Sequence, residues 1–173
     1  MKTQQGTLVN VLATVVAVIA FDQITKEIVL REIGPGTGQP IVEIIPGIFQ
    51  FNFVRNTGSA FGLFQGQSAI LTVLALGAII FLATYYFRKA RNDTLVAVAL
   101  GLQLGGAVGN VVDRIRHGYV VDFIDVSSWP VFNMADSAIT IGVILLMYAL
   151  IFRDYDATEP GSERQLRSAG DDS

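Results

Sequence analysis

Hydrophobic residues in this 173-residue chain gather in long runs that are separated by shorter polar stretches. A helix needs roughly 20 apolar residues to cross the hydrocarbon core of a bilayer. Four runs approach that length, at residues 8–30, 68–87, 94–112 and 131–152. The pattern therefore predicts an all-α membrane protein, folded as a bundle of four transmembrane helices.

The first run has two possible interpretations, because Lys2 precedes it as a basic residue precedes the core of a secretory signal peptide. No small-residue cleavage pattern follows the run, and the helical pattern continues through Asp22 and Lys26. We therefore expect the first run to be a retained membrane span.

Two connections join the predicted spans on the outer side of the membrane. In the first, residues 31–67, phenylalanines alternate with polar residues over 49–53, and Pro46-Gly47 forms a turn signal just before them. This alternation is typical of a half-buried strand, so it predicts a small extracytoplasmic β-sheet. The second connection, residues 113–130, is too polar to span a membrane and too aromatic for a simple linker.

Basic residues set the expected orientation, because lysine and arginine are enriched in cytoplasmic loops. One side of the four-span arrangement carries Lys2, Arg88, Lys89, Arg91, Arg153, Arg164 and Arg167, whereas the other carries Arg31, Arg55, Arg114 and Arg116. We expect both termini in the cytoplasm. Residues 1–153 form the predicted membrane domain, and the charged segment 154–173 is predicted to be a disordered tail.

Composition supports a membrane protein and narrows the possible functions. Charged residues make up 16% of the chain and the mean hydropathy is +0.51, whereas soluble domains carry roughly 25% charge. The net charge is −3 without a basic stripe, which argues against a nucleic-acid partner. The absence of cysteine excludes disulfides, thiolate metal sites and cysteine nucleophiles.

Glycines recur at four-residue spacing in the third run, at Gly101, Gly105 and Gly109. Small residues at this spacing let helix backbones approach closely in lipid. The pattern predicts tight helix packing and not a catalytic role.

Ionisable residues inside a bilayer are costly, so their presence near span ends needs a reason. Asp22 and Lys26 lie one helical turn apart and are expected to form a buried pair that holds the first helix in the bundle. Asn110, Asp113 and Arg114 share one face at the end of the third run and are candidates for either a site or interfacial anchors.

Asp122 and Asp136 bracket the second outer connection, so they meet near the outer membrane surface if the third and fourth spans are neighbours. Two adjacent carboxylates share a proton, and such a pair can hydrolyse a peptide without a covalent intermediate. The same pair could instead bind magnesium or calcium in a non-enzymatic transport bundle, or have only a structural role in an assembly factor. The single histidine, His117, is expected to be a solvated loop residue.

Five sequence motifs, in order over residues 8–152, resemble those of the lipoprotein signal peptidase family. This family is also called signal peptidase II and consists of bacterial membrane aspartic proteases. The matching segments are 22–26 (DQITK), 56–62 (NTGSAFG), 105–114 (GGAVGNVVDR), 120–125 (VVDFID) and 132–137 (FNMADS).

The resemblance implies that Asp122 and Asp136 are catalytic, with neither a metal nor a cofactor. It also implies supporting roles for Asn56, Asn110, Arg114 and Asn133 around the pair and its substrate, and for Asp22 and Lys26 in the scaffold. Asp113 and Asp125 lie outside the implied catalytic set.

The implied substrate is a prolipoprotein whose cysteine carries a diacylglyceryl group, cut just before that cysteine. The implied location is the bacterial plasma membrane, with the active site near the extracytoplasmic face. We expect a monomer, because a bundle of this size can form the site within one chain.

Overall fold

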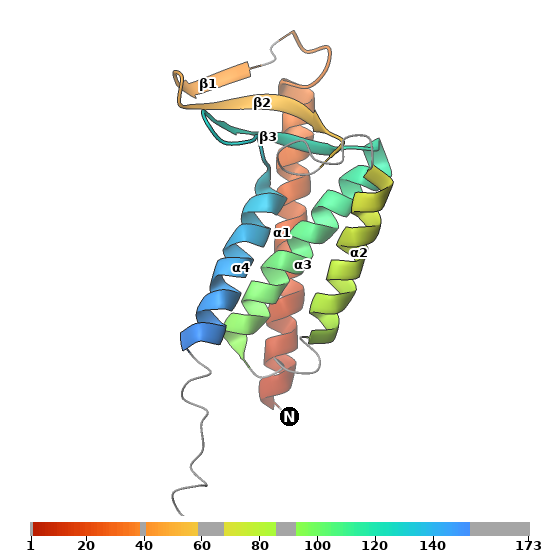
Figure 1. The fold of residues 1–173 in the computed structure, drawn as a ribbon, viewed down its shortest axis with the longest axis vertical. Helices are drawn as coiled ribbons and strands as arrows, with labels where there is room; N and C mark the ends of the chain where they lie inside the picture. Colours follow the sequence, from red (N-terminus) through yellow and green to blue (C-terminus); the bar gives the residue numbers. More distant parts are fainter. Residues whose placement is uncertain (1, 39–40, 59–67, 86–92, 153–173) are drawn as a thin grey trace, which may run out of the picture.

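Four helices lie alongside one another, and a three-stranded sheet covers one end of the bundle (Figure 1). The computed structural model describes residues 2–38, 41–58, 68–85 and 93–152. The helices are α1 (Lys2–Glu32), α2 (Ser68–Tyr85), α3 (Thr94–His117) and α4 (Met134–Phe152). The strands are β1 (Ile41–Ile45), β2 (Phe49–Asn56) and β3 (Val120–Val126).

This architecture confirms the predicted helical membrane fold with a small sheet. In the described part of the chain, three helical segments are long and apolar enough to cross a membrane: Thr7–Glu32, Thr94–His117 and Met134–Phe152. Within α2, the apolar segment Ile70–Leu82 is shorter. The beginning of α1 and the end of α4 lie at the end of the bundle opposite the sheet (Figure 1).

Helix α3 packs against the other three helices, and its glycines allow this close approach. A Cβ atom added at Gly101 would come within 2.8 Å of the Thr14 Cβ, and one at Gly105 within 2.7 Å of the Val18 Cβ, both on α1. Gly106 faces α4 instead, where an added Cβ would overlap the backbone carbonyl of Ala135. The predicted role of the glycines in helix packing is confirmed.

The sheet is antiparallel, in the order β1-β2-β3, and it covers a hydrophobic core at this end of the bundle. This core contains Val29, Ile33, Val121, Phe123 and Ile124, against which Phe49, Phe51 and Phe53 pack. The turn between β1 and β2 places Gly47 at φ 71°, a conformation that glycine adopts without a steric penalty. The strand predicted from the phenylalanine alternation and the turn predicted from Pro46-Gly47 are therefore confirmed.

Helix α3 continues five residues beyond its predicted end at residue 112. Asp113, near its end, is buried at 1% exposure, so this polar position does not mark a loop. The helix ends where Gly118 adopts φ 80° and donates its N–H to the Arg114 carbonyl, a common C-terminal capping arrangement. His117 is the last helical residue and its Nδ1 is buried, so the prediction of a solvated loop residue is wrong.

The second outer connection contains strand β3, which the sequence analysis did not predict. Its run of valine, isoleucine and phenylalanine is typical of a strand, and this was the signal that could have revealed it. Helix α4 begins at Met134, three residues after the predicted start at 131, because Phe132 still pairs with Ile124 of β3.

Two predictions fall on residues outside the described ranges. They are the basic connection with Arg88, Lys89 and Arg91, and the tail from residue 154. The positive-inside orientation and the disordered tail therefore stay predictions.

The glycine packing predicts a difference between two glycine-to-alanine variants. Gly106→Ala should lower the free energy of unfolding by about 1–3 kcal/mol, because the new methyl group overlaps α4 at Ala135. For Gly77→Ala in α2, no heavy atom of the described residues outside the adjacent helix backbone lies within 4 Å of the new Cβ, so it should be neutral or stabilising, by up to about 1 kcal/mol. Denaturation of the detergent-purified variants measures both, and equal effects would contradict the packing role.

Candidate active site

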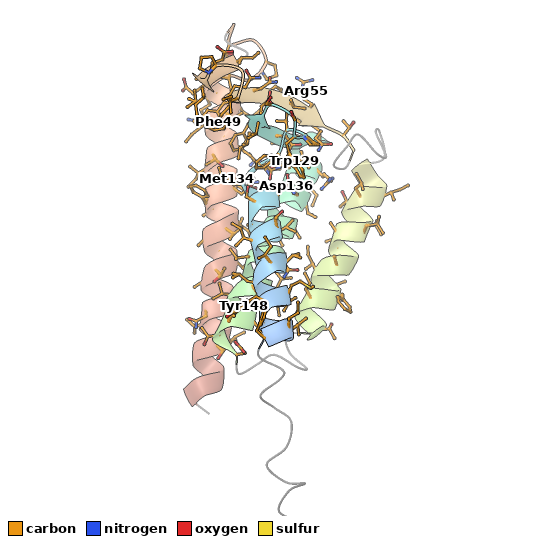
Figure 2. The ribbon with its side chains drawn as sticks, turned by 60° about the vertical axis from the view of Figure 1, so that its left-hand side comes forward. Phe49, Arg55, Trp129, Met134, Asp136 and Tyr148 are labelled. Atoms are coloured by element: carbon orange, nitrogen blue, oxygen red, sulfur yellow. The ribbon has the colours of Figure 1, made fainter. Side chains whose placement is uncertain are left out.

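A cavity of about 640 Å³ lies between the sheet and the ends of α3 and α4 that are next to it. Asp122 from β3 and Asp136 from α4 both line it, so the structure brings the two predicted aspartates to one site. Asn56, Asn110 and Arg114 line the same cavity. Asp136 lies at the sheet end of α4 with Trp129 beside it (Figure 2).

Asp122 is buried at 1% exposure, and both of its carboxylate oxygens accept hydrogen bonds. Asn56 donates from Nδ2 to Oδ2, and Asn133 donates from Nδ2 to Oδ1, each at 2.7 Å. Burial, and secondly the negative charge of Asp136, raise the pKa of the Asp122 carboxyl to about 7. The two amide donors act in the opposite direction, because they stabilise the charged form. Asp122 can therefore change its charge near neutral pH.

Asp136 is fixed by the way in which α4 begins. Its backbone N–H donates to Oδ1 of Asn133 at 3.0 Å, and its Oδ2 accepts from the backbone N–H of Asn133 at 3.3 Å. This reciprocal pattern is that of a capping box, with Asn133 as the cap. The other oxygen, Oδ1, accepts from Nδ2 of Asn110 at 2.8 Å. Because Asn133 binds both aspartates, it fixes them relative to each other.

Asn56 and Arg114 form the side of the cavity near the end of β2. The Oδ1 of Asn56 accepts the N–H of Gly58 at 2.9 Å, which directs its amide nitrogen toward Asp122. Arg114 donates to the carbonyls of Asn110 and Gly58, both at 3.4 Å, and its Nε is buried without a partner among the described residues. Its positive charge is therefore held at the cavity wall.

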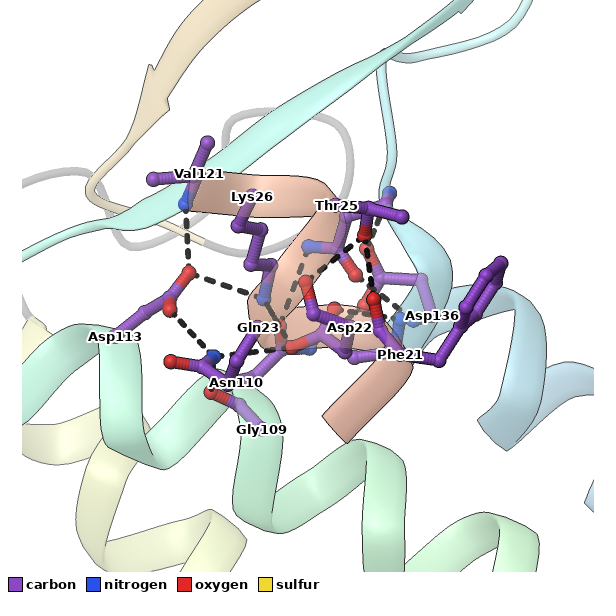
Figure 3. Close-up of polar contacts among 12 residues, drawn as sticks. Phe21, Asp22, Gln23, Thr25, Lys26, Gly109, Asn110, Asp113, Val121 and Asp136 are labelled. Atoms are coloured by element: carbon purple, nitrogen blue, oxygen red, sulfur yellow. Dashed lines mark hydrogen bonds and ion pairs between the residues drawn. The ribbon is translucent and has the colours of Figure 1, made fainter. Parts of the chain in front are cut away.

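Behind the aspartates, the ammonium group of Lys26 is buried in a polar network (Figure 3). Its Nζ contacts Asp22 at 2.9 Å, Asp113 at 3.0 Å and the Oδ1 of Asn110 at 3.0 Å. The predicted pairing of Asp22 with Lys26 is confirmed. The ammonium also orients the amide of Asn110, since it contacts the oxygen and leaves Nδ2 free to donate to Asp136.

The same network holds the backbone just ahead of each aspartate. The Oδ1 of Asp22 accepts the N–H of Ala135, the residue before Asp136, at 3.0 Å. The Oδ2 of Asp113 accepts the N–H of Val121, the residue before Asp122, also at 3.0 Å. The network thus positions both parts of the site through the main chain.

Some site residues were not found from the sequence. Gln23 donates from Nε2 to Asp113 at 2.9 Å and to the Gly109 carbonyl at 3.3 Å, so it links α1 to α3. Apolar residues that line the cavity, such as Trp129 and Ile139, have no sequence signal, because hydrophobic residues are expected in a span. Asp113 and Asp125 lie outside the cavity lining, and Asp125 accepts from Gln50 at 2.6 Å. Among the described residues, no group of three His, Cys, Asp or Glu side chains is placed to hold a metal ion.

Comparison with known proteins gives consistent matches. Residues 14–152 match the family described as "Signal peptidase (SPase) II". The lipoprotein signal peptidase of Halothermothrix orenii is 41% identical over 136 residues, which cover 79% of this chain and 91% of that protein. The lipoprotein signal peptidase of Moorella thermoacetica is 42% identical over 147 residues, covering 84% and 93% of the two chains.

A solved structure has a similar fold. Its description reads "Bacterial membrane enzyme structure by the in meso method at 2.3 A resolution", and its TM-score with this chain is 0.78 at 34% identity. The match covers 86% of this chain and 92% of that chain. From its sequence and its fold, this chain belongs to the signal peptidase II family.

Proposed function

We propose that the protein removes the signal peptide from diacylglyceryl-modified prolipoproteins, cutting just before the lipidated cysteine, with Asp122 and Asp136 as the catalytic pair. Membership of the signal peptidase II family supports the proteolytic activity. The observation that carries the residue assignment is that two carboxylates, the buried Asp122 and the half-buried Asp136, line one cavity and both accept hydrogen bonds from Asn133.

The pair shares one proton, because two adjacent carboxylates cannot both ionise easily. The charged carboxylate accepts a proton from a water molecule, whose oxygen attacks the carbonyl carbon of the scissile bond. The protonated carboxyl donates its proton to the carbonyl oxygen, which gives a tetrahedral diol. When the diol collapses, the carboxyl that took the proton from water donates it to the leaving nitrogen, and the carbon–nitrogen bond breaks. The other carboxylate takes a proton from a diol hydroxyl as the new carboxyl group forms, so the pair returns to its starting state.

The surrounding amides and the guanidinium assist the pair. Asn56, Asn110 and Asn133 hold the carboxylates in place by the hydrogen bonds described above. Arg114 lines the cavity with a positive charge, which favours a negatively polarised peptide carbonyl at the site.

The placement in the membrane follows from the same proposal. All four helices span the bacterial plasma membrane, both termini are cytoplasmic, and the sheet and cavity face the extracytoplasmic side. This arrangement is supported by the position of the N-terminal end of α1 opposite the sheet (Figure 1). The substrate's acyl chains leave the cavity past Ile139 and Ile141, which line it on α4. One chain supplies every residue of the proposed site, so a monomer suffices.

The first prediction concerns the two aspartates. Asp122→Asn and Asp136→Asn should each lower turnover by about 100-fold to 10,000-fold, because an amide cannot exchange the proton. Asp125→Asn is the matched control, since Asp125 lies on the same strand but contacts Gln50 outside the cavity. Cleavage of a diacylglyceryl-modified prolipoprotein by the detergent-purified variants, with excess chelator, measures the effect.

Two results would contradict the catalytic assignment. A folded Asn variant that retains cleavage would show that its aspartate is not required. Loss of wild-type cleavage in chelator would indicate a bound cation and would favour the cation-site alternative.

The second prediction concerns pH. Because the pKa of Asp122 is raised to about 7, the pair retains its shared proton below this pH and loses it above. The proton donor is then absent, so kcat should fall as the pH rises through about 7. Cleavage rates at saturating substrate on both sides of neutrality, with folding checked by circular dichroism, test this. A constant or rising kcat through this range would contradict the shared proton.

The third prediction concerns the support that the Lys26 network gives to the site. Lys26→Met leaves Asp22 and Asp113 buried without their cation, which should cost about 3–5 kcal/mol of unfolding free energy. Arg31→Met breaks only the exposed pair with Glu27, so it should cost less than about 1 kcal/mol. Denaturation of the purified variants measures the difference, and equal losses would refute the role of Lys26.

A further inference from the structure

A second cavity, of about 250 Å³, lies on the other side of the strands that carry the site. Its wall is formed by the end of α1, all three strands and the first residue of α4, Met134. We call it the rear groove, and its lining includes Ile28, Glu32, Val42, Phe51, Phe123 and Met134. Its lining is apolar apart from Glu32 and Thr25.

The rear groove is separate from the catalytic cavity. Asp122 and Phe123 are consecutive residues of β3, and consecutive strand side chains point to opposite faces of a sheet. Asp122 lines the catalytic cavity and Phe123 lines the rear groove. The described linings of the two cavities have no residue in common.

The rear groove continues the lipid-facing surface of α1. Phe21, Ile24 and Ile28 are exposed at 58%, 58% and 53%, and their spacing places them on one face of the helix. Because α1 is long and apolar enough to span a membrane, this exposed face contacts acyl chains. Ile28 belongs both to this face and to the groove lining, so an acyl chain lying along α1 can enter the groove.

An unpaired carboxylate lies at the outer end of this path. Glu32 is the last residue of α1, is exposed and lines the groove. Its neighbour Arg31 is already paired with Glu27 at 2.8 Å. Within the described residues, no ion pair or hydrogen bond engages the Glu32 carboxylate. An acyl path that ends at a free negative charge matches a lipid with a cationic headgroup.

We propose that the rear groove binds one acyl chain of a bilayer phospholipid with a primary-amine headgroup, whose ammonium pairs with Glu32. The bound chain contacts Phe123, next to Asp122, and Met134, two residues before Asp136. The lipid thereby fills the space behind both parts of the catalytic site. This binding needs no turnover, so it can be tested independently of the proposed protease function.

The experiment uses a photoactivatable phosphatidylethanolamine that carries a diazirine in its acyl chain. The full chain is reconstituted in phosphatidylcholine vesicles with a trace of this lipid, extracted into detergent to remove loosely held lipid, and irradiated. Peptide mapping by mass spectrometry should then find the label in the groove residues of α1, β1 and β2.

Two variants of β1 make the mapping specific. Val42→Glu places a charge in the groove and should abolish the labelling. Ile44→Glu places the same charge at an exposed position of the same strand that lines neither described cavity, so it should retain the labelling. Absence of groove labelling in the wild type, or equal loss in both variants, would overturn the proposal.

A third arm tests the headgroup. The same photoactivatable chain on phosphatidylglycerol should label the groove less than it does on phosphatidylethanolamine. Glu32→Gln should remove this difference, whereas Glu43→Gln, a carboxylate of β1 outside the groove lining, should preserve it. Equal labelling by the two wild-type lipids would overturn the assignment of Glu32.

The remaining arm distinguishes other occupants. Saturating diacylglyceryl-modified prolipoprotein should leave the groove label unchanged. Displacement of the label by this substrate would assign the groove to the substrate's own acyl chain and overturn the phospholipid proposal. Crosslinks between two copies of the chain through the groove would likewise overturn it.

Discussion

The site depends on one buried positive charge, the ammonium group of Lys26. A charge in the interior of a membrane protein is costly unless it is paired and hydrogen-bonded, and Lys26 contacts two carboxylates and one amide oxygen. The carboxylates, in turn, accept backbone N–H groups from β3 and α4. The requirement to compensate one charge therefore fixes the relative positions of α1, α3, α4 and the sheet.

Close helix packing is what allows this compensation. An added Cβ at Gly109 would come within 2.5 Å of the Asp22 Oδ2, so the absence of a side chain there leaves the room that the carboxylate needs beside α3. The glycines of α3 and the polar residues at its sheet end thus act together. The glycines let α1 approach α3 closely. This close approach brings Lys26 of α1 into contact with the polar residues of α3.

The two cavities lie on opposite faces of the sheet. Alternation along β3 directs Asp122 toward the catalytic cavity and Phe123 toward the rear groove. In the proposed arrangement, substrate binds on the first face and bilayer lipid on the second. In this proposal, the strand that carries Asp122 therefore contacts lipid through Phe123 on its other face.

Much of the fold could be predicted from the sequence, because run length, strand alternation and four-residue glycine spacing are local patterns. The local spacing of Asp22 and Lys26 likewise determined their pairing, and the motif resemblance identified the polar residues around the site. The sequence did not determine that α3 continues through Asp113, since polar residues resemble a loop until their buried partners are known. The tertiary structure alone decided that Asp113 and Asp22 hold the backbone beside each aspartate, that Asn133 joins the pair, and that Trp129 and Ile139 line the cavity. These contacts join residues from different helices and strands, so their geometry depends on how the elements pack and not on any local pattern.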